Sequence, residues 1–115
     1  MAGGSCIFCT LQESQDTTQF LFNNKFVYAI RDINPRAPVH VLIIPKKHIP
    51  DVSEIMLEDN EILSQMFVAS REISKSEGVN TSGYRLAINK GKDANMSVDH
   101  LHMHLIGGRA LETEG

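Results

Sequence analysis

The stretch DHLHMHLIGGR, residues 99–109, places three of the five histidines of this 115-residue chain at alternate positions, His100, His102 and His104. Residues two apart point to different sides of an α-helix but to the same face of a β-strand, so the spacing predicts a strand. Leucine and methionine stand between the histidines, and the same strand would turn them toward a core. The stretch therefore predicts a half-buried strand with three imidazoles on its polar face.

The composition indicates one globular domain over residues 1–115. Hydrophobic residues make up 42% and charged residues 22%, and the net charge is -3 with no long basic block. This balance argues against nucleic acid or a membrane surface as the partner. The longest apolar run, FVYAI at 26–30, is too short to span a membrane, and the N-terminus lacks the basic start and apolar core of a signal peptide. We expect a cytoplasmic protein whose partner is a small molecule.

Helical signals occur twice. Residues 6–13 predict a short helix, and apolar residues at mostly helical intervals over 58–77 predict one long amphipathic helix that stops at Gly78. Between them, residues 19–32 predict a hairpin that turns at 23–25, because asparagine tolerates the left-handed conformation of tight turns.

Two further segments have strand character. The apolar run at 40–45 predicts a central strand that ends at Pro45. Residues 84–89 predict another strand, and 89–97 form a polar loop that leads to the histidines. The order of hairpin, strand, long helix and two strands predicts an α+β fold, an antiparallel sheet backed by a helix.

Three hypotheses account for the row of imidazoles. Satisfied polar residues at a core edge are the first, but burying three imidazoles without partners costs roughly a few kcal/mol each. A catalytic metal is the second, limited because the outer histidines of such a strand lie about 13 Å apart. In the third, the row faces a phosphate. His102 then attacks it, since a neutral imidazole is nucleophilic near pH 7, while His100 and His104 bind oxygens and protonate the departing group.

The preceding loop favours the phosphate hypothesis. Asn89, Gly91 and Ser97 belong to a segment of small and amide-bearing residues whose backbone N–H groups can approach an anion. Lys90 and Lys92 add positive charge there. The sequence thus favours phosphate chemistry, with metal-dependent hydrolysis as the competing hypothesis.

The segment HLHMHLI at 100–106 resembles the H-φ-H-φ-H-φ-φ signature of the histidine triad (HIT) family, where φ is apolar. RDINPRAPVHVLIIPKKHI at 31–49 and GYRLAINKG at 83–91 are similar to its Hint branch, the purine nucleoside phosphoramidases. The resemblance implies a single HIT domain with a five-stranded antiparallel sheet, one long and one short helix, and a homodimer in which two sheets become continuous. It also implies a purine nucleotide substrate, an AMP or GMP derivative, and no catalytic cofactor.

The resemblance assigns roles in the hydrolysis of nucleoside 5'-phosphoramidates. His102 matches the nucleophile that attacks the α-phosphorus and forms a nucleotidyl-histidine, from which water releases the nucleoside monophosphate. His104 matches the residue that contacts the phosphate and helps the leaving amine, and Ser97 matches a hydroxyl near that amine. His40 matches a fourth histidine on the strand beside the triad.

Nucleotide-binding positions follow from the same resemblance. Asp32 matches a carboxylate that binds the ribose, which is chemically suitable because a carboxylate accepts two hydrogen bonds from a diol. Asn89 matches a phosphate-side contact. Met96 occupies a position where relatives usually have glutamine, which removes a polar contact near the phosphate. The base pocket, for which simple core packing is the alternative, is matched by Ile7, Phe8, Leu11 and Ile33.

Family branches differ at the third histidine. The nucleotidyltransferase branch has glutamine there, so His104 favours a hydrolase. Diadenosine polyphosphate hydrolases also keep three histidines and are the alternative enzyme, and a nucleotide-binding dimeric scaffold is the alternative from another class. The tail after Arg109 lacks the aromatic residues that reach the partner's active site in eukaryotic Hint proteins, so the resemblance does not predict the leaving group.

Cys6 and Cys9 form a C-x-x-C motif, which suits a redox pair, half of a zinc site or two ordinary thiols. A redox motif normally follows a strand, and none precedes this one. Zinc would need two further ligands, for which His48 and His100 are candidates, and some microbial HIT proteins that this chain resembles use such a set. Structural zinc and free thiols both remain open. With zinc, His100 anchors its strand; without it, His100 is a hydrogen-bonding partner of the triad.

Overall fold

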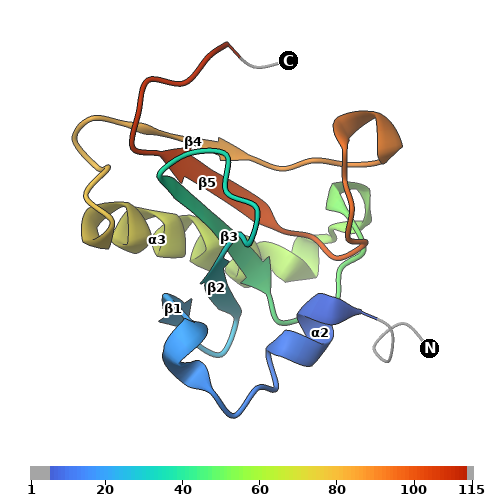
Figure 1. The fold of residues 1–115 in the computed structure, drawn as a ribbon. Coiled ribbons are helices and arrows are strands. Elements are labelled where there is room, and N and C mark those ends of the chain that lie inside the picture. The colour runs from blue at the N-terminus through green and yellow to red at the C-terminus, as the bar shows by residue number, and fades with distance from the viewer. Residues whose placement is uncertain (1–5, 114–115) are drawn as a thin grey trace.

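The computed structural model describes residues 6–113, so residues 1–5 and 114–115 of the expected domain lie outside the described residues. Strands form one antiparallel sheet in the order β1-β2-β3-β5-β4, flanked by two α-helices (Figure 1). The α+β fold predicted from the sequence is therefore confirmed. The elements are α2 (Ile7–Leu11), β1 (Phe22–Asn23), β2 (Val27–Arg31), β3 (Val39–Pro45), α3 (Asn60–Ser76), β4 (Tyr84–Ala87) and β5 (Met103–Gly107).

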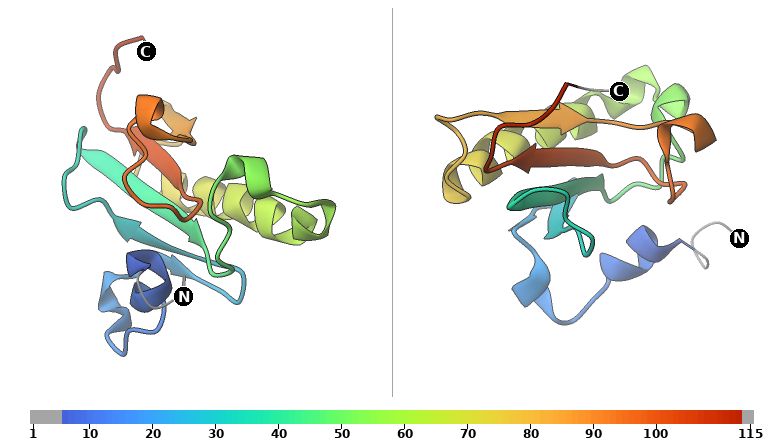
Figure 2. Two further views of the ribbon diagram at one scale, coloured as in Figure 1. Left: turned by 90° about the vertical axis from the view of Figure 1, so that its right-hand side faces the viewer. Right: turned by 45° about the horizontal axis from the view of Figure 1, so that its top comes forward.

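The two faces of the sheet differ in what lies against them. β3 lies at its centre and every residue of the strand is buried, as the continuous apolar run predicts. Alternation sends Val41 and Ile43 into the main core with α3, and it sends His40 and Leu42 to the opposite face. Figure 2 shows α3 on one side of the sheet and α2 on the other. The face away from α3 is therefore where polar chemistry can lie.

The predicted histidine strand is wrong in one respect. β5 begins only at Met103, so His104 lies in the strand while His100 and His102 precede it. The β3–β5 ladder ends at the pair Ile43–Met103, and the Leu101 amide donates to the Ile49 carbonyl in the loop after β3 instead, at 2.7 Å. The alternation of side chains nevertheless persists: the residues between the histidines are buried in the main core, namely Leu101, Met103 and Leu105.

The predicted hairpin exists, but its turn works differently. β1 is only two residues long, because residues 17–19 form a 3-10 helix. Neither Asn23 nor Asn24 adopts the left-handed conformation, since Asn95 is the one non-glycine residue with positive φ within 6–113. Asn24 instead accepts the amides of Phe26 and Val27 through its side-chain oxygen, at 2.8 and 2.9 Å. The side chain therefore closes the turn.

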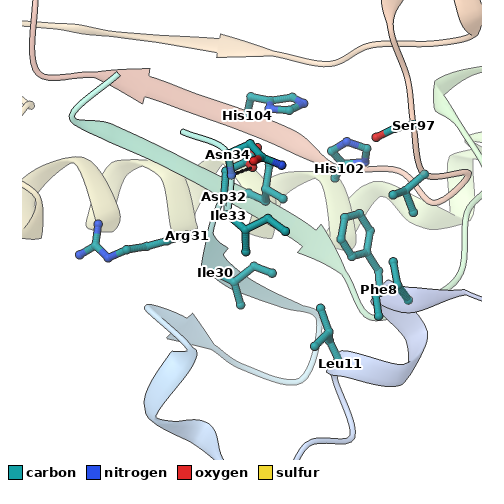
Figure 3. A pocket seen from close by; sticks show the side chains of 13 residues that line it. Phe8, Leu11, Ile30, Arg31, Asp32, Ile33, Asn34, Ser97, His102 and His104 are labelled. Atoms are coloured by element: carbon teal, nitrogen blue, oxygen red, sulfur yellow. Dashed lines mark hydrogen bonds between the residues drawn. The ribbon is translucent and has the colours of Figure 1, made fainter. Parts of the chain in front are cut away.

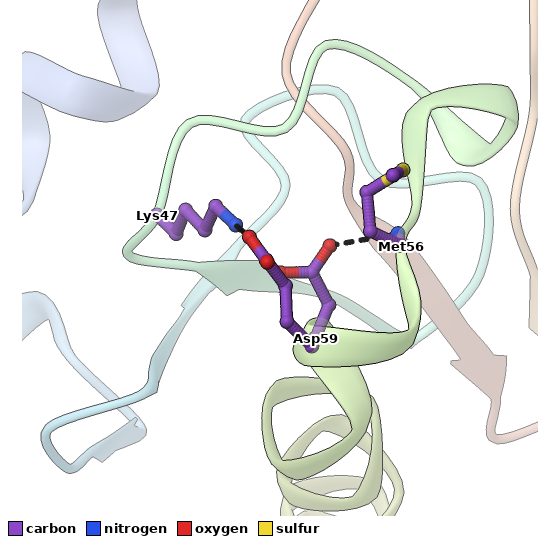
Figure 4. Close-up of polar contacts among 4 residues, drawn as sticks. Lys47, Met56 and Asp59 are labelled. Atoms are coloured by element: carbon purple, nitrogen blue, oxygen red, sulfur yellow. Dashed lines mark hydrogen bonds and ion pairs between the residues drawn. The ribbon is translucent and has the colours of Figure 1, made fainter.

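Helix α3 confirms the predicted long helix, and both of its ends are fixed. At its start, the buried Asp59 carboxylate accepts from Lys47 Nζ at 2.7 Å and from the Met56 amide at 3.0 Å (Figure 4). The Lys47 hydrogen bond holds the pKa of Asp59 below its ordinary value. At its end, Gly78 has a φ of 76°, and its amide and that of Val79 satisfy the last carbonyls. The Lys47–Asp59 contact ties α3 to the loop that carries His48.

Within residues 6–113, neither helix has the length and apolar character that crossing a bilayer requires.

Candidate active site and metal centre

His102 presents a free ring nitrogen. Its Nδ1 lies 2.8 Å from the carbonyl oxygen of His100. A carbonyl only accepts, so Nδ1 carries the proton and Nε2 keeps its lone pair. The Phe8 ring packs edge-on against the imidazole, with centroids 5.2 Å apart. Backbone and aromatic contacts thus orient an imidazole whose Nε2 is the ring nitrogen available for nucleophilic attack.

His40 and His104 form an imidazole pair, and their tautomers are fixed as that of His102 is. The Arg36 amide donates to His40 Nδ1 at 3.1 Å, so the proton of neutral His40 lies on Nε2. That nitrogen is 2.9 Å from His104 Nδ1 and 3.3 Å from Asp32 Oδ2. His104 Nδ1 therefore accepts, and its own proton lies on Nε2. The chain of contacts leaves His104 as a hydrogen-bond donor beside His102, with ring centroids 5.1 Å apart.

Burial keeps this pair neutral. Desolvation, together with the neighbouring rings of His102 and His40, lowers the pKa of His104 to about 4. Burial also lowers the pKa of His40. Both rings are therefore uncharged at neutral pH, and the tautomers deduced from their partners apply.

His102 and His104 line a cleft with two lobes, and Figure 3 shows the residues around the first of them. One lobe, of about 270 Å³, is mainly apolar, and the other, of about 170 Å³, is polar. His102, His104, Asp32 and Ser97 line both. The apolar lobe is completed by Ile7, Phe8, Leu11, Ile30, Arg31, Ile33, Asn34, Leu42 and Val98. The polar lobe is completed by Asn34, Arg36, Asn89 and Asn95.

The fold brings most of the sequence-predicted nucleotide-binding residues to this cleft. All four residues of the predicted base pocket line the apolar lobe, and Asn89 lines the polar lobe. Met96 lines neither lobe. The Asp32 carboxylate lies between them, with Oδ1 accepting the Asn34 amide at 2.9 Å and Oδ2 facing His40. One side of the cleft is therefore suited to an aromatic base and the other to polar groups.

Sequence reasoning missed several cleft residues. Ile30 and Leu42 lie on the sheet face that carries His40, and strand alternation could have identified them. Arg36, Asn34 and Asn95 could not be found in that way, because they come from loops that only the tertiary fold brings together. Asn95 has a left-handed backbone, with a φ of 61°, in the loop before Ser97.

His100 faces away from the cleft, into a cluster with Cys6, Cys9 and His48. Its Nε2 donates to the Pro45 carbonyl at 2.8 Å, so its Nδ1 lone pair points to the other three residues. Nδ1 lies 3.3 Å from Cys6 Sγ, 3.6 Å from Cys9 Sγ and 3.1 Å from His48 Nδ1. Cys9 Sγ is in turn 3.3 Å from His48 Nδ1, and both cysteines are free thiols.

These four residues fit a tetrahedral metal ion. Their donor atoms all lie within 4.8 Å of one another. Zinc bound to sulfur at about 2.3 Å and to nitrogen at about 2.0 Å separates neighbouring S and N ligands by about 3.5 Å, close to the distances in the cluster. The Pro45 carbonyl provides the outer hydrogen bond that orients a metal-binding imidazole.

A second group with metal-ligating atoms, Asp32, His40 and His104, also lies within 4.8 Å. The Arg36 amide occupies His40 Nδ1, so His40 would present a proton, not a lone pair, to an ion at Nε2. This hydrogen bond disfavours metal coordination inside the cleft.

The fold and site define a small α+β domain that presents a free imidazole nitrogen in a cleft with one apolar and one polar lobe. The HIT domain model matches residues 13–111, and the chain belongs to the histidine triad (HIT) family. It is 37% identical over 105 residues to the purine nucleoside phosphoramidase of Escherichia coli strain K12, which covers 91% of this chain and 88% of that protein.

Solved structures agree with this assignment. The HIT family hydrolase from Clostridium thermocellum superposes with a TM-score of 0.90 at 40% identity, covering 96% of each chain. A zinc-bound histidine triad family protein from Mycobacterium smegmatis superposes with a TM-score of 0.78 at 28% identity, covering 93% of this chain and 77% of that one. The family resemblance seen in the sequence is therefore confirmed.

Proposed function

We propose that this protein hydrolyses purine nucleoside 5'-phosphoramidates to a nucleoside monophosphate and an amine, through a nucleotidyl intermediate on His102. The observation that carries the proposal is the hydrogen bond of His102 Nδ1 to the His100 carbonyl, which leaves Nε2 as the ring nitrogen available at the junction of the apolar and polar lobes. The likeness to the Escherichia coli purine nucleoside phosphoramidase supports the choice of substrate.

The two lobes suggest how such a substrate lies. The base occupies the apolar lobe against Phe8 and Leu11, and the ribose hydroxyls approach Asp32 at its edge. The α-phosphate then lies beside His102 and His104, and the leaving amine extends into the polar lobe. In this pose the nucleophile, the phosphorus and the leaving nitrogen lie along the axis that joins the lobes.

The reaction takes place in two steps. In the first, His102 Nε2 forms a bond to phosphorus as the P–N bond breaks, and the departing nitrogen takes up a proton from solvent, which His104 Nε2–H and the Ser97 hydroxyl relay, so that neither group is left anionic. In the second, water attacks the phosphorus, the bond to His102 breaks, and the water releases a proton to solvent. The sum consumes one water and restores the free imidazole.

Rapid mixing with adenosine 5'-phosphoramidate, followed by a denaturing quench at alkaline pH and mass spectrometry of the protein and its peptides, tests this mechanism. We expect a transient nucleotidyl adduct on a peptide that contains His102, together with AMP release. Turnover without any adduct, or an adduct that persists in His102→Ala, would contradict it. Diadenosine tetraphosphate in parallel tests the alternative hydrolase: a much higher kcat/KM on it would replace the proposed substrate. A protein that binds AMP but turns over neither compound would be a nucleotide-binding scaffold.

We also propose that Cys6, Cys9, His48 and His100 bind structural zinc. The donor geometry and the zinc-bound relative from Mycobacterium smegmatis support this assignment. When bound, the ion would join α2 and the loop after β3 to the segment that leads into β5. It would thereby hold His100, whose carbonyl accepts the hydrogen bond from His102 Nδ1. Metal analysis should find one zinc per chain, lost in Cys9→Ser. Substoichiometric metal after purification in zinc would favour free thiols.

Finally, we propose a homodimer in which two sheets become continuous. β4 is an edge strand of the described sheet and carries the partly exposed Tyr84, and edge strands are where a second copy can extend a sheet. Light scattering after size-exclusion chromatography should give twice the monomer mass. A monomer at micromolar concentration would contradict this assembly.

A further inference from the structure

The Arg36 backbone is held from both sides, in the loop between β2 and β3. Its amide donates to His40 Nδ1 at 3.1 Å, and its carbonyl accepts from Arg109 Nη2 at 2.8 Å. Arg109 follows β5 directly, so the loop is tied both to the imidazole pair and to the end of the histidine-bearing strand. The hydrogen bonds therefore fix the point from which the Arg36 side chain extends.

The Arg36 side chain brings an uncommitted positive charge to the polar lobe. Arg36 lines that lobe, and the described residues 6–113 include no acidic group in an ion pair with it. Burial is the main cause of the lowered pKa values of His40 and His104, and the positive charge of Arg36 lowers both in the same direction. The exposed Arg36 thus adds a positive charge at the edge of the polar lobe, and no ion pair among the described residues neutralises it.

The rest of the polar lobe offers neutral hydrogen-bonding groups. They come from Asn34, Asn89, Asn95 and Ser97. The carboxylate of the lobe, on Asp32, is engaged by the Asn34 amide and lies 3.3 Å from His40 Nε2. A guanidinium surrounded by amides and a hydroxyl matches a planar or tetrahedral oxyanion better than an ammonium or an apolar group.

We propose that Arg36 determines leaving-group specificity, selecting amines that carry an anionic oxyacid group, a carboxylate or a phosphate, near the scissile nitrogen. The inference rests on the proposed phosphoramidate hydrolysis, because it places the leaving amine in the polar lobe. The guanidinium binds the oxyacid in a charge-assisted, bidentate manner while the apolar lobe holds the base. The preferred substrate then has its negative charge on the far side of the phosphorus from the nucleoside.

Three adenosine 5'-phosphoramidates of closely matched size test the proposal: the glycine, the glycinamide and the aminoethyl phosphate derivatives. The wild type should show a kcat/KM on the glycine compound at least about 10-fold higher than on the glycinamide compound. Arg36→Gln should remove most of this preference by lowering kcat/KM on the glycine compound, while kcat/KM on the glycinamide compound should change less than about 3-fold. Arg36→Lys should restore part of it. Arg71→Gln is the matched control, since Arg71 is exposed on α3, across the sheet from the cleft, and should leave the preference unchanged.

The outcomes separate this inference from the function on which it rests. Equal loss on the charged and neutral compounds in Arg36→Gln, or no loss on either, would overturn a specificity role. If Arg36→Gln lowers kcat/KM more on the aminoethyl phosphate compound than on the glycine compound, phosphate is the preferred oxyacid and the inference is supported. Calorimetric binding of the same compounds to His102→Ala needs no turnover. Preference for the charged compounds there supports Arg36 even if hydrolysis fails, and its absence overturns the inference.

Discussion

The catalytic cleft and the Cys/His cluster use the same side chain in opposite ways. His100 and His102 are two residues apart, yet His100 donates from Nε2 to the Pro45 carbonyl and His102 donates from Nδ1 to the His100 carbonyl. The first ring therefore directs its Nδ1 lone pair at two thiols and His48, and the second directs its Nε2 lone pair at the cleft. The carbonyl to which each ring donates determines which nitrogen keeps its lone pair, and this supports the roles we propose, metal ligand for His100 and nucleophile for His102.

The two regions also differ in the property to which we expect their residues to contribute. The Cys/His cluster joins three segments that are distant in sequence, so with the proposed zinc bound we expect it to contribute to stability. The cleft holds neutral imidazoles beside open space, so its contribution is to chemistry. Changes in the cluster should therefore alter mainly stability, and removal of His102 from the cleft should alter mainly rate.

The largest effect on rate is expected from His102→Ala. Removing the attacking nitrogen should lower kcat by about 10³-fold or more. AMP affinity should change less than about 3-fold, because both lobes remain. Zinc content and Tm should stay near wild type. A residual rate within 10-fold of wild type would show that His102 is not the nucleophile.

The converse experiment is His48→Ala, which removes an imidazole from the cluster and none from the cleft. Zinc binding should be lost and the Tm should fall by more than about 10 °C, corresponding to roughly 2–3 kcal/mol of stability. Differential scanning calorimetry and metal analysis measure both. The rate per folded molecule should stay within about 3-fold of wild type. A loss of rate equal to that of His102→Ala would erase the distinction between the two regions.

The buried pair in the cleft predicts a pH dependence of stability. The pKa of His104 falls to about 4 in the folded protein, from an ordinary value of 6.5. The unfolded chain thus binds the extra proton first. Stability is complete above pH 6.5 and declines as the pH drops toward 4, by on the order of a few kcal/mol.

Urea unfolding of wild type and His104→Asn between pH 7.5 and 5 measures this term. Both proteins keep the Cys/His cluster, so the difference between them cancels its titration. The free energy of unfolding of the wild type should fall toward that of His104→Asn as the pH falls. The groups that face His104 are Asp32, His40, His102 and the charged Arg36. A difference that is constant with pH would contradict a buried neutral imidazole.

The smallest effect is expected from Ser97→Ala. The hydroxyl lines both lobes but is one of two proton donors near the leaving amine. Its removal should lower kcat/KM by about 3- to 10-fold, more for strongly basic amines than for weakly basic ones. A plot of rate against amine pKa for both proteins tests this. An identical slope in the two proteins would remove Ser97 from proton donation.

The sequence predicted the helices and strands better than the residues at which they begin and the contacts between segments. Alternation correctly placed Leu101, Met103 and Leu105 in the core, because side-chain direction persists even where the ladder ends. It could not show that β5 begins only at Met103, since that depends on the Leu101 amide meeting Ile49. Tautomers were equally out of reach, because each is fixed by a carbonyl or amide from another segment or by the local bend of the chain.

The site shows the same division. Residues on strands or in the family motif, such as His40 and His104, could be identified in advance. Arg36 could not, because its place in the polar lobe follows from two loop hydrogen bonds, to His40 and from Arg109. The cluster of Cys6 and Cys9 with two distant histidines needed either a family resemblance or the folded structure.

The most direct test of the account is the rate of adenosine 5'-phosphoramidate hydrolysis by protein dialysed against excess chelator, with circular dichroism to measure the folded fraction. The account predicts that the rate per folded molecule persists without metal, because His102 performs the chemistry and any zinc at Cys6 and Cys9 is structural. If the rate vanishes while the fold remains and added zinc restores it, the reaction is metal-centred and the role assigned to His102 is wrong.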